Sequence, residues 1–188
     1  MPRRGLDRAQ VVEAAAAIAD ADGLEAVTLA RVAGALGVRP PSLYNHVAGR
    51  AGLLRALAAQ STGELAAALR RAATGRAGAA AIAAVAAAQR SYALEHPGRY
   101  AATVAAPAAG DAEHERAAAE AVDVLAAVFG GAGLEGDDLV HAIRALRSAV
   151  HGFAAIETAG GFGLPADREE SFRRLVEALA QYTPGTRG

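Results

Sequence analysis

The sequence contains no cysteine, no lysine and no tryptophan, and only 4% of its 188 residues are aromatic. Without cysteine, the chain can form neither a disulfide framework nor a thiolate-ligated zinc site. All 19 basic residues are arginine. This excludes Schiff-base chemistry on lysine and the phosphate-binding lysine of nucleotide-binding loops.

Long apolar runs are also missing. The longest run, residues 77–88, has 12 residues, contains Gly78 and lies between Arg76 and Gln89, whereas a bilayer span needs about 18 residues. The charged start of the chain is not followed by an apolar segment, so it does not have the pattern of a signal peptide. We therefore expect no membrane association and a cytoplasmic location.

The residues that are present favour a folded chain with an uneven charge distribution. Hydrophobic residues make up 53%, which is too many for a disordered chain. Residues 1–76 contain ten arginines and six acidic residues, a net +4, and residues 77–188 contain nine arginines and fourteen acidic residues, a net −5. This balance favours an N-terminal head that meets a polyanion.

Alanine is the commonest residue and leucine, arginine and glutamate are frequent, and these four residues favour helices. No window alternates with a period of two for long, so we predict an all-α fold of about nine helices. Caps and breakers set the boundaries, with capping-box patterns at residues 7–10 and 167–170 and glycines at Gly23, Gly37 and Gly49. The expected helices span approximately residues 7–22, 28–36, 40–48, 50–74, 76–95, 97–106, 112–129, 137–156 and 167–182.

The segment from Thr28 to Arg50 is the most informative part of the chain. Two short helical patterns are joined by residues 36–39, where Gly37 supplies the positive φ that a tight turn requires. This arrangement is typical of a helix-turn-helix, whose second helix enters a major groove. The apolar side chains expected to form its small core are Leu36, Val38, Leu43 and Val47, packed against Val11, Leu24 and Val27.

Polar side chains are left on the outer face of the second helix. Ser, Asn and His can bind base edges or phosphates, Arg and Tyr can reach phosphates, and Pro can contact a thymine methyl group. The expected DNA-binding residues are Thr28, Arg39, Pro41, Ser42, Tyr44, Asn45, His46 and Arg50. An ordinary helical hairpin with a solvated face would show a similar pattern, and that alternative stays open at this point.

The string Thr28–Val47, TLARVAGALGVRPPSLYNHV, resembles the DNA-binding segment of the TetR family of bacterial transcription regulators. The flanking Ala14-Ala15, Asp22-Gly23-Leu24 and residues 49–54 extend this resemblance over residues 6–60. Further on, residues 148–153 and 160–165 resemble one ligand-binding domain of that family, the WHG type.

The chain departs from the family pattern at three positions. Arg39 stands where Ser or Thr often caps the recognition helix, Val47 where Phe is commoner, and Arg50 where Lys is commoner. Because Arg and Lys differ in donor geometry, a phosphate contact from Arg50 would be placed differently.

The resemblance implies a DNA-binding domain in residues 1–50, a connecting helix in residues 50–74, and a ligand-binding and dimerisation domain in residues 76–188. It further implies a homodimer that binds a palindromic DNA operator and is released by a small-molecule effector, with repression the expected role. Two-fold symmetry also follows from geometry, because one short recognition helix reads few bases.

Apolar residues at three- and four-residue steps on the last two helices are candidates for the dimer interface. An intrachain core would show the same spacing, so both interpretations stay open for the first of these helices. The candidate interface residues are Val150, Phe153, Ile156, Phe172, Leu175, Val176 and Leu179.

Polar and aromatic residues within the apolar helices of the second half are candidates for a ligand pocket. The steps between His141, Arg144, Ser148 and His151 place these four on one helix face, which could instead be a hydrated or interface stripe. The candidate pocket residues are Tyr92, His96, Tyr100, Phe129, His141, Arg144, Ser148 and His151.

Enzymatic activity is not expected. The sequence contains no His-Glu-x-x-His pair, no nucleophile elbow and no glycine-rich phosphate loop. The run Glu113-His114-Glu115 does not suit a metal, because adjacent helical residues face apart. We expect no cofactor and no metal. The remaining alternative is a helical homodimeric module that binds small molecules or proteins without binding an operator.

Overall fold

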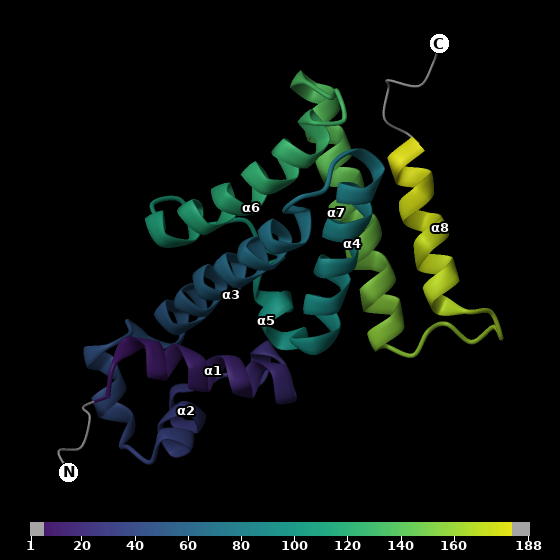
Figure 1. Ribbon diagram of the computed structural model, residues 1–188. Helices are drawn as coiled ribbons and strands as arrows, with labels where there is room; N and C mark the ends of the chain where they lie inside the picture. The colour runs from purple at the N-terminus through teal and green to yellow at the C-terminus, as the bar shows by residue number, and fades with distance from the viewer. Residues whose placement is uncertain (1–5, 182–188) are drawn as a thin grey trace. The chain divides into compact units, whose positions relative to one another are not determined.

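The computed structural model describes residues 6–181, and within that range the chain folds into helices without strands (Figure 1). This confirms the predicted all-α fold. The predicted helix end at Tyr182 lies outside the described residues. No helix in the described part is both long and apolar enough to span a membrane. The elements are α1 (Arg8–Asp22), η1 (Leu24–Ala26), α2 (Leu29–Leu36), η2 (Pro40–Asn45), α3 (Gly49–Ala73), α4 (Gly78–Glu95), α5 (Pro97–Ala102), α6 (Ala112–Gly130), α7 (Gly136–Thr158) and α8 (Arg168–Gln181).

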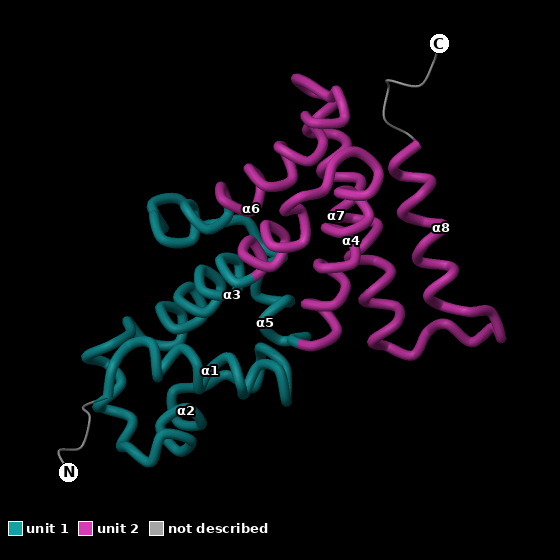
Figure 2. The backbone as a smooth tube through the Cα atoms, in the orientation of Figure 1, with its two compact units in different colours: residues 1–64, 96–118 teal, residues 65–95, 119–188 magenta. Residues whose placement is uncertain are grey.

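Figure 2 divides the chain into two compact units. Unit 1 comprises residues 1–64 and 96–118, and unit 2 comprises residues 65–95 and 119–188. Helices α3 and α6 therefore each contribute to both units. Within unit 1, the described elements include α1, η1, α2, η2 and α5.

Short-range signals explain the helix ends in unit 1. The Asp7 side chain accepts a hydrogen bond from the Gln10 amide at 2.8 Å, and the Gln10 side chain accepts one from the Asp7 amide at 3.0 Å. This is the predicted capping box. Thr28 caps α2 by accepting from the Arg31 amide at 3.2 Å, and Gly37 ends α2 at φ 66°.

The core of unit 1 forms where α1, α2, η2 and α3 converge. Its buried members include Val11, Val27, Leu43 and Val47, and the predicted partners Leu24, Leu36 and Val38 pack against them. Burial of aliphatic side chains is the main stabilising term in such a core. The helix-turn-helix core predicted from spacing is therefore confirmed.

The second helix of this motif is a 3-10 helix rather than the expected α-helix. Its characteristic three-residue hydrogen bonds run from the Ser42 amide to the Arg39 carbonyl at 2.9 Å and from the His46 amide to the Leu43 carbonyl at 2.9 Å. Two prolines, Pro40 and Pro41, occupy its first turn, and the segment has only six residues. Short connecting segments of this kind commonly adopt the 3-10 form.

Helix α5 packs closely on α1 within unit 1. A methyl group on Gly98 would come within 2.0 Å of the carbonyl carbon and oxygen of Ala19, so only a residue without a side chain fits there. The helix ends at Ala102, earlier than the expected residue 106.

In unit 2, α4, α7 and α8 pack against one another. Arg90 of α4 joins them: Nε and Nη2 each donate to Glu157 of α7 at 2.8 Å, and Nη1 and Nη2 donate to Glu169 of α8 at 2.7 and 2.6 Å. The guanidinium also lies 5.3 Å from the ring centre of Phe153 and 4.7 Å from that of Phe172. An ion pair flanked by aromatic rings thus holds three helices together.

Candidate nucleic-acid interface

The outer face of η2 is polar and exposed. Leu43 is fully buried, whereas Tyr44 beside it is 63% exposed. Pro41, Ser42 and Asn45 are also exposed, and His46 is half-buried. The inward leucine anchors the segment in the core and leaves the side chains that can bind DNA pointing outward.

Arg39 precedes this face and is free to bind an anion. It is the residue before η2, it makes no capping hydrogen bond, and it is exposed. Within residues 6–181, its guanidinium has no hydrogen-bond or ion-pair partner. An unengaged guanidinium is well suited to a phosphate group.

Thr28 and Arg50, two of the expected DNA-binding residues, make hydrogen bonds within unit 1. The Thr28 hydroxyl oxygen accepts the capping bond from the Arg31 amide. The Arg50 side chain donates from Nε to the Val27 carbonyl at 2.8 Å and from Nη2 to the Leu24 carbonyl at 3.2 Å. Sequence spacing could not reveal this, because the acceptors lie more than twenty residues away.

Three other described arginines of unit 1 are also paired. Arg8 binds Glu113 at 2.6 Å, Arg31 binds Asp22, and Arg99 binds Glu13, Asp20 and Glu64. Among the described residues of unit 1, Arg39, Arg55 and Arg116 have no such partner, and their guanidinium groups are open to phosphate contacts.

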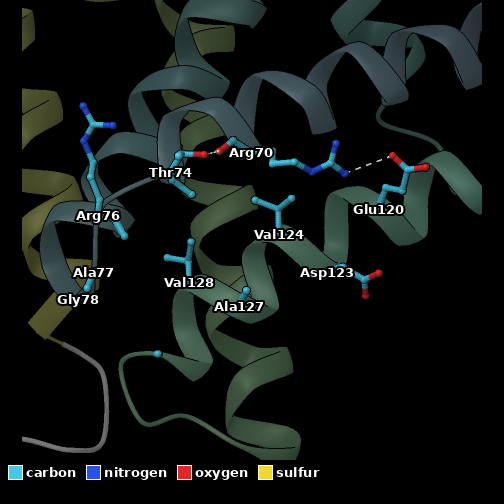
Figure 3. Close-up of a pocket in the computed structure, with 13 residues that line it drawn as sticks. Arg70, Thr74, Arg76, Ala77, Gly78, Glu120, Asp123, Val124, Ala127 and Val128 are labelled. Carbon is cyan, nitrogen blue, oxygen red and sulfur yellow. Dashed lines mark hydrogen bonds and ion pairs between the residues drawn. The ribbon is translucent and has the colours of Figure 1, made fainter.

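Figure 3 shows a groove of about 460 Å³ in unit 2, between the end of α3, the start of α4 and α6. Ala73, Ala81, Val124 and Val128 contribute its apolar surface. Charged side chains stand around it. They are Arg70, Arg76, Glu120 and Asp123, and Arg70 donates to Glu120 at 3.3 Å.

The candidate pocket residues do not line this groove, and they are divided between the two units. His96 and Tyr100 belong to unit 1, and the other six belong to unit 2. Tyr92, Tyr100 and Phe129 are buried, and His96 and His151 are half-buried. On α7, His141, Arg144 and Ser148 are exposed. Sequence reasoning missed the groove because short alanine-rich segments carry no signal for a hollow.

The candidate dimer residues divide into three sets by exposure. Val150, Phe172 and Val176 are buried within the chain. Ile156 is 46% exposed and is available to a partner. Phe153, Leu175 and Leu179 are half-buried.

The run Glu113-His114-Glu115 spreads its side chains apart. Glu113 pairs with Arg8, Glu115 accepts from the Gly110 amide at 3.1 Å, and buried His114 lies 3.3 Å from the Thr62 hydroxyl. Among the residues that the structure describes, no group of three or more metal-ligating side chains converges.

Comparison with known families gives matches in both halves of the chain. Residues 11–57 match the family described as "Bacterial regulatory proteins, tetR family". Residues 82–179 match "Tetracyclin repressor-like, C-terminal domain".

Two curated relatives are similar over nearly the whole chain. The uncharacterized HTH-type transcriptional regulator Rv0681 of Mycobacterium tuberculosis is 37% identical over 176 residues, covering 93% of this chain and 80% of the relative. The uncharacterized HTH-type transcriptional regulator YobS of Bacillus subtilis is 33% identical over 180 residues, covering 95% and 90%.

Solved structures show the same fold. A protein of unknown function from a Rhodococcus species superposes with a TM-score of 0.79 at 25% identity, covering 96% of both chains. A TetR variant from Acinetobacter baumannii, solved in complex with minocycline, superposes with a TM-score of 0.71 at 20% identity, covering 94% of this chain and 96% of that one.

Proposed function

Because this chain belongs to the TetR family of helix-turn-helix transcription regulators, we propose that it is a ligand-responsive repressor. It binds a palindromic operator as a homodimer, and a small-molecule effector releases it. The observation that carries this proposal is the exposed polar face of η2 beside buried Leu43. The working assignment is DNA binding by residues 1–50, connection by residues 50–74, and ligand binding and dimerisation by residues 76–188.

The head reads DNA through η2 and the residues that flank it. Ser42, Asn45 and His46 offer hydrogen bonds to base edges or phosphates, and Pro41 offers apolar contact. Tyr44, at 63% exposure, can place its phenol on a phosphate. Since such a reader acts on the bacterial chromosome, the protein works in the cytoplasm.

Dimerisation follows from the small size of the reading segment. A six-residue η2 covers few bases, so specific binding needs two heads on successive turns of the duplex. Exposed Ile156 on α7, with half-buried Phe153, Leu175 and Leu179, supplies an apolar surface for a second copy. Burial of that surface would favour association.

The effector acts through unit 2. The groove between α3, α4 and α6 has a volume suited to a small organic ligand. A TetR variant of the same fold was solved in complex with minocycline, which supports a small-molecule effector for this chain. A ligand shifts DNA affinity only by its different affinity for the DNA-binding and released conformations.

The decisive experiment is selection of bound duplexes from a random pool, followed by affinity measurement against salt. The expected result is a palindromic sequence and a steep loss of affinity as salt rises. Tyr44→Ala should weaken binding, whereas the control Leu164→Ala, in an 83% exposed loop position of unit 2, should not. The proposal fails if the wild-type protein binds no duplex in dilute buffer.

A further inference from the structure

The Arg50 side chain forms hydrogen bonds with backbone carbonyls near η1 in unit 1. Its Nε donates to the Val27 carbonyl at 2.8 Å, and its Nη2 donates to the Leu24 carbonyl at 3.2 Å. The same Nη2 lies 3.3 Å from Glu25, whose side chain is 98% exposed. Nε and Nη2 are thus engaged by two carbonyls and one carboxylate, although the Arg50 side chain is still 41% exposed.

These bonds join two parts of the chain that flank the reading segment. Leu24 and Ala26 bound the 3-10 turn η1, which comes directly before α2. Arg50 is the second residue of α3, which follows η2 after a short turn. One side chain therefore connects the segment before α2 to the start of α3, which follows η2.

The carbonyl contacts account for a cation at this position. A cation in the first turn of a helix faces the positive end of the helix dipole, so α3 itself does not stabilise the charge of Arg50. The planar fork of arginine presents Nε and Nη2 together, a geometry that lysine cannot reproduce.

Resting on the DNA-binding function proposed above, we propose that Arg50 is a positioning residue. It holds η1 against the start of α3 and so sets the orientation of η2, and it makes no contact to phosphate. A phosphate contact comes instead from Arg39, before η2, whose guanidinium has no partner among the described residues. This role differs from the phosphate contact that the family resemblance implies for Arg50.

The first test uses the selected operator duplex and counts phosphate contacts. The affinity for the duplex is measured as a function of salt concentration for wild type, Arg50→Gln, Arg50→Lys and Arg39→Gln. Stoichiometric titration gives the active fraction of each preparation, so that affinities are compared per active dimer. Loss of one phosphate contact per head lowers the slope of log affinity against log salt by about 1.8, because each contact contributes about 0.9. We expect this in Arg39→Gln and an unchanged slope in Arg50→Gln.

Affinity itself should fall in both Arg50 variants. If the competent arrangement drops to about a tenth in each head, affinity falls about tenfold per head and about a hundredfold for the dimer. Because lysine cannot replace the fork, Arg50→Lys should not rescue. A wild-type affinity in Arg50→Lys together with a reduced slope in Arg50→Gln would make Arg50 a phosphate ligand and overturn the proposal.

The second test needs no DNA. The Ala26 and Val27 amides donate within η1 to the Gly23 carbonyl at 3.2 Å and the Leu24 carbonyl at 3.1 Å. Their hydrogen exchange should accelerate in Arg50→Gln and stay unchanged in the control Arg55→Gln, an exposed arginine on the same helix. Unchanged exchange in Arg50→Gln would overturn the proposal, even if the wild-type protein bound no duplex and the proposed function failed separately.

Discussion

Asp20 receives two hydrogen bonds from Arg99: the backbone amide donates to Oδ1 at 2.8 Å, and Nε donates to Oδ2 at 2.9 Å. The same guanidinium reaches Glu13 at 2.5 Å and Glu64 at 3.3 Å. Burial works to lower the pKa of Arg99, but the hydrogen bond to Glu13 and the charges of Glu64 and Glu13 outweigh it and raise the pKa above its ordinary value. Arg99 therefore stays charged and joins α5 to α1 and α3 in unit 1.

Replacing Asp20 with Asn should destabilise the protein. The substitution removes the charge that accepts from Nε, and the pair is largely buried, with side-chain exposures of 14% and 18%. Hydrogen bonds to charged groups contribute about 1.5–3 kcal/mol, so we expect a loss of that order in urea unfolding. Asp22→Asn is the matched control, because Asp22 pairs with Arg31 at the surface with both side chains 48% exposed. An equal loss in the two variants would contradict the prediction.

Gly98→Ala should be costly because α5 leaves no room for a methyl group. The new atom would meet the Ala19 backbone at 2.0 Å, and overpacking of this kind costs about 1–3 kcal/mol or more. We expect a clear drop in thermal midpoint. Gly63→Ala is the control, since a methyl group there meets nothing within 4 Å and α3 continues through it. That variant should be neutral or more stable by up to about 1 kcal/mol.

Glu157→Gln should lower the free energy of unfolding at neutral pH and make that free energy less dependent on pH in the acid range. The hydrogen bond from Arg90 lowers the pKa of Glu157 below its ordinary value. The ionised carboxylate therefore stabilises the fold above its unfolded pKa, about 4.3, and this contribution is lost as pH falls through the lower folded pKa. Wild type should lose stability more steeply than Glu157→Gln below about pH 5.

The measurement for Glu157 is a series of urea midpoints from pH 7 to pH 3. At pH 7 we expect a loss of about 1–3 kcal/mol, since Glu157 is only 11% exposed. Glu177→Gln is the control, because its pair with Arg173 is a surface contact along α8 with both side chains 53% exposed. Parallel pH curves for wild type and Glu157→Gln would show that the Arg90 pair does not set the acid response.

Ile156→Arg should weaken the proposed homodimer. The side chain is 46% exposed on α7, and an unpaired charge in an apolar interface is unfavourable. We expect the dimer dissociation constant, measured by sedimentation, to rise at least tenfold. A tenfold rise corresponds to about 1.4 kcal/mol. Leu164→Arg, at an 83% exposed position of the α7–α8 loop, should leave association unchanged. If both variants dimerise as tightly as the wild type, the interface does not include Ile156 on α7.

The features that could be predicted from the sequence are local ones. The capping box of Asp7 and Gln10, the Thr28 cap and the turn at Gly37 depend on residues within four positions of one another. The buried Leu43 and Val47 follow from helical spacing. Such signals act before tertiary packing and survive it.

The partners of three arginines could not be predicted. Arg50, Arg90 and Arg99 bind groups 23 to 86 residues away, and a charged residue carries no sign of which distant group it meets. The apolar faces of the last two helices could not be assigned either, because periodicity defines a face and not its partner. Val150 and Phe172, two candidates for the dimer interface, are buried within their own chain. At α8, Asp167 caps as expected, but Glu170 turns to Arg173 and Arg174 instead of completing the box.

The 3-10 winding of η2 determines how its side chains meet a duplex. With three residues per turn, positions three apart are eclipsed, so Pro41 and Tyr44 share one ridge and Ser42 and Asn45 another. A rise of about 2 Å per residue separates ridge neighbours by about 6 Å, close to two steps of about 3.4 Å along DNA. In the proposed complex with DNA, side chains on one ridge would therefore be spaced for base pairs about two steps apart.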